Sequence, residues 1–82
     1  MKARRVYEKI LAGARDIRFE DLCRLAEGFG FGRDRVSGSH HIYRHPSGVM
    51  LNLQPDRNHH AKSYQVRQLL MLVEENGLTL ND

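Results

Sequence analysis

The spacing of apolar residues changes twice along this chain of 82 residues, and these changes limit the folds that it can adopt. The first clear pattern is the i, i+3, i+4, i+7 spacing of one helical face, at Phe19, Leu22, Cys23 and Ala26. The next pattern has the period of two that is typical of a strand, at Val49, Leu51 and Leu53. Helical spacing then returns at Val66, Leu69, Leu70 and Val73. The chain is therefore expected to run from helix through strand to helix.

Weaker signals complete the order of elements. A thin apolar stripe at Val6, Ile10 and Leu11 predicts a first helix over residues 4–12. Residues 33–36 and 40–45 are expected to be strands, and residues 46–48 form a turn between the second strand and the third. Ser63 is the expected N-cap of the last helix, which should stop at Asn76-Gly77. This order predicts an α+β fold, a three-stranded antiparallel sheet with helices on one face.

Length and cysteine content favour one small domain in a reducing compartment. The single cysteine, Cys23, cannot form an internal disulfide and is expected to be a small core residue. No apolar run approaches the length of a membrane span, and the basic segment 1–5 is not followed by the apolar block of a signal peptide. We expect a soluble, cytoplasmic protein that does not interact with a membrane.

Positive charge is concentrated in the middle of the chain. The net charge is only +3, but residues 33–67 carry six Lys and Arg against two Asp, together with all five histidines. A basic patch attracts phosphate backbones without reading their sequence. The alternative is a solvated face that binds no ligand.

Residues 38–46, Gly-Ser-His-His-Ile-Tyr-Arg-His-Pro, carry three of the histidines. Histidine changes charge near neutral pH, so it suits a position at which a proton must move. Alternation along the strand places His40, Ile42 and Arg44 on one face, and their neighbours His41, Tyr43 and His45 on the other. A zinc site is not expected, because the histidines have no cysteine partners and no i, i+4 helical pair.

These motifs together resemble the HicA toxins of bacterial HicA–HicB toxin–antitoxin modules. The resemblance covers about residues 19–78 and includes Gly-Phe-Gly-Phe at 28–31, the Gly-Ser-His motif at the head of the second strand, and a final helix that ends Glu-Asn-Gly-Leu at 75–78. It implies a domain over residues 19–82 with an α-β-β-β-α fold similar to the double-stranded-RNA-binding domain, preceded by a helical extension over residues 1–18. Residues 52–62 differ from the basic, Gly-rich loop that is common in the family.

The resemblance also implies a function and a site. The family cleaves mRNA, and its functional histidine follows Gly-Ser, which is His40 in this chain. The expected partners are mRNA and a HicB-type antitoxin that covers this histidine, and no cofactor or metal is expected. His40 could act as general base or as general acid.

Several residues are candidates for contacts with RNA. Arg44 shares the face of His40 and could stabilise phosphate charge, and Arg35, Lys62 and Arg67 are further candidates. Ser39 could hydrogen-bond the histidine or a phosphate, or it could be only a turn residue. Two other functions stay open, a non-catalytic RNA-binding module of the same fold and a protein that binds an acidic partner.

Overall fold

The computed structural model describes residues 2–81 and contains three helices and three strands. In chain order the elements are α1 (Ala3–Leu11), α2 (Phe19–Gly28), β1 (Gly32–Ser37), β2 (His40–Arg44), β3 (Met50–Leu53) and α3 (Ser63–Asn76). This order confirms the predicted α+β class. Met1, the first residue of the predicted extension 1–18, and Asp82, the last residue of the predicted domain 19–82, lie outside the described residues. Within the described part, none of the helices has the length and apolar character that crossing a membrane requires.

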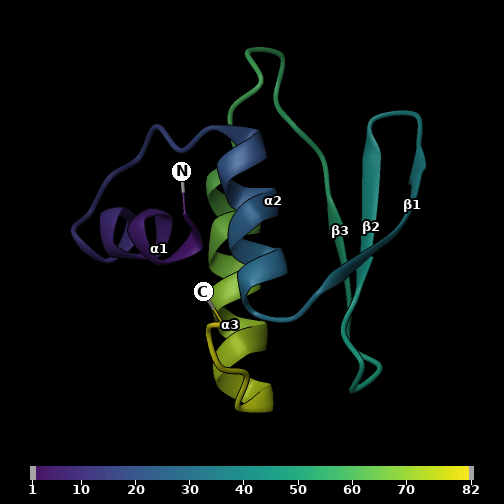
Figure 1. Ribbon diagram of the computed structural model, residues 1–82. Coiled ribbons are helices and arrows are strands. Elements are labelled where there is room, and N and C mark those ends of the chain that lie inside the picture. The colour runs from purple at the N-terminus through teal and green to yellow at the C-terminus, as the bar shows by residue number, and fades with distance from the viewer. Residues whose placement is uncertain (1, 82) are drawn as a thin grey trace.

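The elements form three layers (Figure 1). The strands pair antiparallel in the order β1-β2-β3, and α2 and α3 lie together against one face of this sheet. Helix α1 packs on the far side of α2 and α3, away from the sheet. The other sheet face, which we call the open face, is not covered by any element of the described chain. The expected three-stranded sheet with helices on one face is confirmed.

The hydrophobic core lies between the sheet and the helices. The predicted apolar stripe of α2 is largely buried, with Leu22 and Ala26 fully inaccessible and Cys23 half-buried. The sheet contributes the alternate residues Tyr43, Leu51 and Leu53, whose side chains are at most 1% exposed. Because alternate residues of a strand point to opposite faces, these three positions fix which face of β2 and β3 meets the helices.

Helix α3 differs from the prediction at its start. Ser63 is the first helical residue and Lys62 occupies the N-cap position, without any side-chain hydrogen bond to the helix end. Of the predicted apolar face only Leu69 is fully buried, whereas Gln65 one turn earlier is also buried. The buried amide is tolerated because its Oε1 accepts a hydrogen bond from the backbone N–H of Gln54 at 3.0 Å. The predicted end is confirmed, since Gly77 follows α3 with a left-handed φ of 61°.

Helix α1 shares the core with the rest of the chain. Ala3 and Val6 are buried, and the ring of Tyr7 meets Phe29 edge-to-face at a centroid distance of 5.5 Å. Leu11, which was expected to join the apolar stripe, is the last residue of α1 and is 65% exposed. The two helices come close at Gly28 of α2, where a Cβ atom would lie 2.5 Å from the Cβ of Ala3.

Strand β1 forms one edge of the sheet, and all six of its residues are exposed. Its pairing with β2 shifts by one residue between Arg33 and Arg35, which leaves Asp34 at a bulge. The strand is one residue longer at each end than the predicted segment 33–36. Strand β2 ends one residue earlier than predicted, because His45 already belongs to the turn into β3.

Candidate functional site

His40 lies at the beginning of β2, directly after the turn that joins it to β1. It pairs with Ser37 across a loop of two residues, Gly38 and Ser39. Gly38 has a φ of 59°, which a glycine at the first loop position of a tight hairpin adopts without steric cost. The Gly-Ser pair therefore ends β1 and places His40 at the head of the next strand.

The two faces of β2 carry different kinds of residue. Tyr43 faces the helices, and so do its neighbours two positions away, since the ring of His41 contacts Phe19 and that of His45 contacts Phe31, at centroid distances of 4.9 and 5.5 Å. His40, Ile42 and Arg44 consequently occupy the open face, as the predicted alternation required. Ile42 and Tyr43 are both suited to burial, and the structure buries Tyr43 fully and Ile42 only in part.

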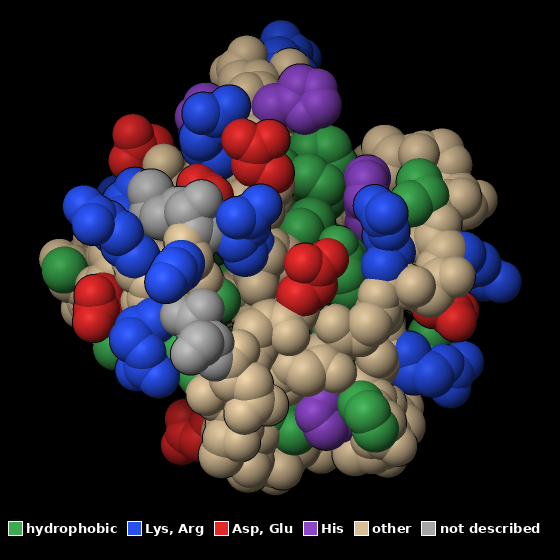
Figure 2. Space-filling view, in the orientation of Figure 1, with side chains coloured by type: hydrophobic (Ala, Val, Ile, Leu, Met, Phe, Trp, Pro, Cys, Tyr) green, Lys and Arg blue, Asp and Glu red, His purple; other side chains and the backbone are tan. Residues whose placement is uncertain are grey.

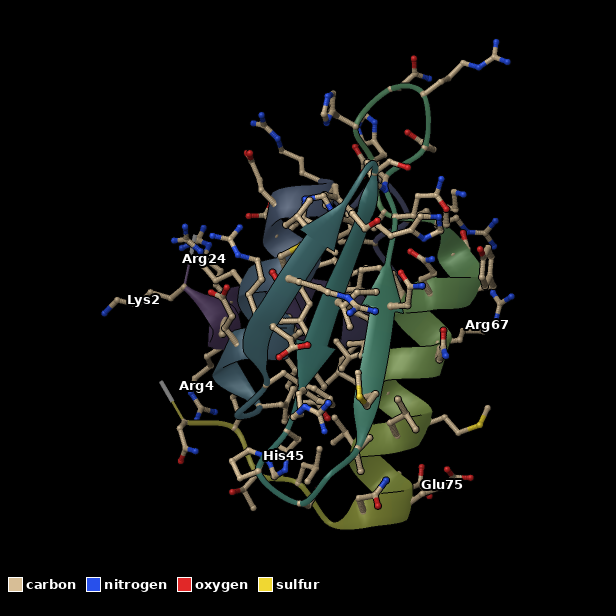
Figure 3. All side chains as sticks on the ribbon, turned by 90° about the vertical axis from the view of Figure 1, so that its right-hand side faces the viewer. Lys2, Arg4, Arg24, His45, Arg67 and Glu75 are labelled. Carbon is tan, nitrogen blue, oxygen red and sulfur yellow. The ribbon has the colours of Figure 1, made fainter. Side chains whose placement is uncertain are left out.

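The strand register shows which residues share the open face with His40. Ile42 lies opposite Arg35 of β1 on one side and Asn52 of β3 on the other, and Arg44 lies opposite Met50. Figure 3 shows this face toward the viewer, with the helices behind the sheet. Two guanidinium groups therefore share with His40 a surface that no carboxylate of β2 or β3 enters.

His40 makes a defined contact through one ring nitrogen. Its Nδ1 is 3.2 Å from the side-chain Oδ1 of Asn52. An amide oxygen can only accept a hydrogen bond, so this contact requires the proton on Nδ1. In the neutral ring the free lone pair is then on Nε2, and the side chain is exposed. The arrangement offers a proton acceptor to a ligand on the open face.

Ser39 is a turn residue with a specific partner. Its Oγ accepts a hydrogen bond of 2.9 Å from the side-chain amide of Gln54, which follows β3. The structure therefore engages Ser39 with β3, next to the contact between His40 and Asn52.

The predicted RNA-contact residues fall into two groups. Arg35 and Arg44 lie on the open face with His40, and Ser39 adjoins it. Lys62 instead directly precedes α3 and Arg67 lies in its second turn, where Arg67 lines a hollow with Arg15 and Ser63. Figure 3 shows Arg67 on the outer side of α3, away from the sheet. A further gathering of Lys and Arg side chains, visible in Figure 2, lies over α1 on the opposite side of the molecule.

The remaining histidines have structural partners. His41 Nδ1 is 3.1 Å from the carbonyl oxygen of Ser39, and His45 Nδ1 accepts a hydrogen bond from the backbone N–H of Ser47. His59 and His60 lie in the loop before α3, where Asp56 accepts hydrogen bonds from the backbone of His60 and Asn58 and its pKa is thereby lowered. Across residues 2–81, no group of three His, Cys, Asp or Glu side chains has the geometry of a metal site.

Cys23 faces the sheet near Tyr43. Burial raises the pKa of the thiol, against a smaller opposing effect of its hydrogen bond with the tyrosine. Burial likewise raises the pKa of the Tyr43 hydroxyl. These groups are neutral at physiological pH, in agreement with the predicted core role of the cysteine.

Asn52 and Gln54 were not expected in the site. Both lie at the alternate, outward positions of the segment 49–54, and both contact the Gly-Ser-His motif. The signal that could have found them is the pair of amide residues at two successive outward positions, 52 and 54, of a segment that pairs antiparallel with the histidine strand.

Comparison with known families gives a match over most of the chain. The family model described as the HicA toxin of bacterial toxin–antitoxin systems matches residues 19–77, which begins at the first residue of α2 and ends just after α3. Comparisons with curated proteins and with solved structures found no significant match. The matched segment contains the three strands of the sheet, with His40 and its hydrogen-bond partner Asn52.

Proposed function

The chain belongs to the HicA toxin family of bacterial toxin–antitoxin systems, and on this basis we propose that it is a metal-independent endoribonuclease that cleaves mRNA. His40 is the proposed catalytic residue. The observation that supports this role best is the contact of His40 Nδ1 with Asn52, which leaves Nε2 as an exposed proton acceptor. HicA toxins are known as mRNA interferases, and the activity of this chain is inferred from that membership.

RNA supplies its own nucleophile for this reaction. The 2′-hydroxyl gives its proton to Nε2 of neutral His40, and the 2′-oxygen attacks the adjacent phosphorus. A bond from phosphorus to the 2′-oxygen forms and the bond to the 5′-oxygen breaks, and the leaving oxygen takes a proton from the imidazolium or from water. A general base in such a position contributes ~10²–10⁴-fold to the rate. The contact with Asn52 is kept in both forms of the ring, because Nδ1 carries a proton in the neutral Nδ1–H tautomer and in the imidazolium alike.

The basic residues would bind the phosphates. Arg35 of β1 and Arg44 at the end of β2 lie on the same open face as His40. A guanidinium group on this face can stabilise the negative charge of the transition state. Lys62 and Arg67 would contact the phosphate backbone of the RNA at a second place, beside the start of α3. Each neutralised phosphate releases counterions, so binding should weaken steeply with salt.

The partner in this proposal is a HicB-type antitoxin. It would cover the open face, which the chain's own elements leave bare and where His40 is exposed. Because mRNA is the proposed substrate, we place the protein in the cytoplasm.

The function is tested by RNA cleavage in EDTA with three purified proteins, the wild type, His40→Ala and His59→Asn. His59 is an exposed histidine beside the start of α2, and asparagine tolerates its left-handed φ of 61°. We expect cleavage by the wild type and by His59→Asn, and a loss of ~10²–10⁴-fold in His40→Ala. Undiminished cleavage by a folded His40→Ala would exclude the catalytic role.

A second candidate function is RNA binding without cleavage. The observation behind it is the orientation of β2, because His41 and His45 contact Phe19 and Phe31 and so provide no second histidine beside His40 as a separate general acid on the open face. In that case neither the wild type nor His40→Ala cleaves RNA, and both bind it with the same salt dependence.

A further inference from the structure

We propose that Asn52 is the positioning residue of His40, which holds the imidazole in the Nδ1–H tautomer so that Nε2 is the proton acceptor. The inference rests on the proposed nuclease function for its catalytic consequence, whereas its structural part can be tested without RNA. The observation that carries it is the 3.2 Å contact between His40 Nδ1 and Asn52 Oδ1.

The amide is presented by a rigid part of the fold. Asn52 lies in β3 between Leu51 and Leu53, whose side chains are 1% and 0% exposed. These two anchors fix the backbone on both sides of Asn52 and direct its side chain to the open face. A histidine that is bonded at one nitrogen to a fixed acceptor loses the rotation and the tautomer exchange of a free ring.

The chemistry of the amide suits an anionic substrate. Catalytic histidines are often oriented by a carboxylate, which also stabilises the imidazolium form. A carboxylate on the open face would oppose the charge of Arg35 and Arg44 and would repel a phosphate. An uncharged oxygen fixes the ring without either effect.

A second hydrogen bond strengthens the positioning. Gln54 donates from its side chain to Ser39 Oγ at 2.9 Å, and its backbone N–H donates to the buried Gln65 of α3. The turn before His40 is therefore tied through the end of β3 to the helical layer. Together the side chains of Asn52 and Gln54 hold the beginning of β2, where His40 lies.

The first test reads the tautomer directly. We would record the ring ¹⁵N chemical shifts of His40 in the wild-type protein at a pH at which the ring is neutral, and compare them with Asn52→Val, which keeps a residue suited to a strand. Met50→Leu, on the same face of β3, is the control. We expect a protonated-type Nδ1 in the wild type and the control, and a shift toward the Nε2–H form in Asn52→Val. Equal tautomer populations in the wild type and Asn52→Val would overturn the proposal.

The second test separates positioning from a structural effect. RNA cleavage by Asn52→Val should fall about 10-fold or more through kcat, with unchanged RNA affinity, because only the orientation of the base is lost. Asn52→Asp, which keeps an acceptor oxygen, should restore the Nδ1–H tautomer. A changed tautomer with full cleavage would refute the positioning role. No cleavage by the wild type, with the expected tautomers, would refute the nuclease function alone.

Discussion

The substitution Gly28→Ala tests whether α1 is firmly docked on the matched domain. A methyl group at this position would lie 2.5 Å from the Cβ of Ala3 and 2.9 Å from Cδ1 of Leu80, whereas carbon atoms in good contact are about 3.5–4.0 Å apart. The helix α1 or the C-terminal tail must therefore move by about 1 Å. Because the Ala3 methyl group is attached directly to the backbone of α1, no side-chain rotation can relieve the contact.

The expected free-energy change combines two effects. Overpacking of a tight contact costs about 1–3 kcal/mol, and replacing glycine by alanine in a helix recovers up to about 1 kcal/mol. The net destabilisation is then about 1 kcal/mol, which lowers Tm by about 4–8 °C in a domain of this size. Thermal and urea unfolding followed by circular dichroism would measure it.

Two further variants make the reasoning refutable. Gly32→Ala is the matched control, because the nearest atom to its added methyl group is 3.9 Å away and stability should stay within about 0.5 kcal/mol. The double variant Ala3→Gly, Gly28→Ala moves the methyl group from one helix to the other and should show favourable coupling in a double-mutant cycle. A Gly28→Ala protein as stable as the wild type, without coupling to Ala3, would show that α1 does not pack as described.

Two predictions concern pH. Burial raises the pKa of Cys23 above its ordinary 9.0, so the stability gained from a neutral thiol is present below pH 9 and is lost as pH rises through the folded-state pKa. Between pH 8 and pH 10, the free energy of unfolding measured in urea should therefore fall less in Cys23→Ala than in the wild type. An equal fall in both proteins would contradict the burial effect. Backbone hydrogen bonds, chiefly from His60, lower the pKa of Asp56 below its ordinary 3.8, so its stabilising effect is present above that pH and disappears as pH falls through the folded value. Asp56→Ala should therefore lower Tm more at pH 7 than at pH 2, and a Tm difference that is the same at both would rule this out.

Local patterns predicted much of the fold. The two helical stripes and the alternation at residues 49–53 depend only on which neighbours are apolar, and they yielded the correct order of elements. Alternation along β2 also placed His40 and Arg44 on one face, because that result requires no knowledge of the partner strands.

The missed features depend on contacts between distant segments. The contact of His40 with Asn52 follows from the register of β2 against β3, which the turn at residues 45–49 sets. Gln65 is buried because the backbone of Gln54 needs an acceptor there, and no pattern within α3 reveals this. Ser63 fits the rule for an N-cap, but the helix begins one residue earlier than that rule predicts.

The bulge in β1 has a consequence for the behaviour of the protein at high concentration. An exposed edge strand can pair with the edge of another copy and start aggregation. In β1 the shift of register at Asp34 breaks the even ladder of backbone groups, and Arg33 and Arg35 flank it with charge. The chain can therefore keep a bare sheet face for its ligands while the β1 edge resists the growth of intermolecular sheets.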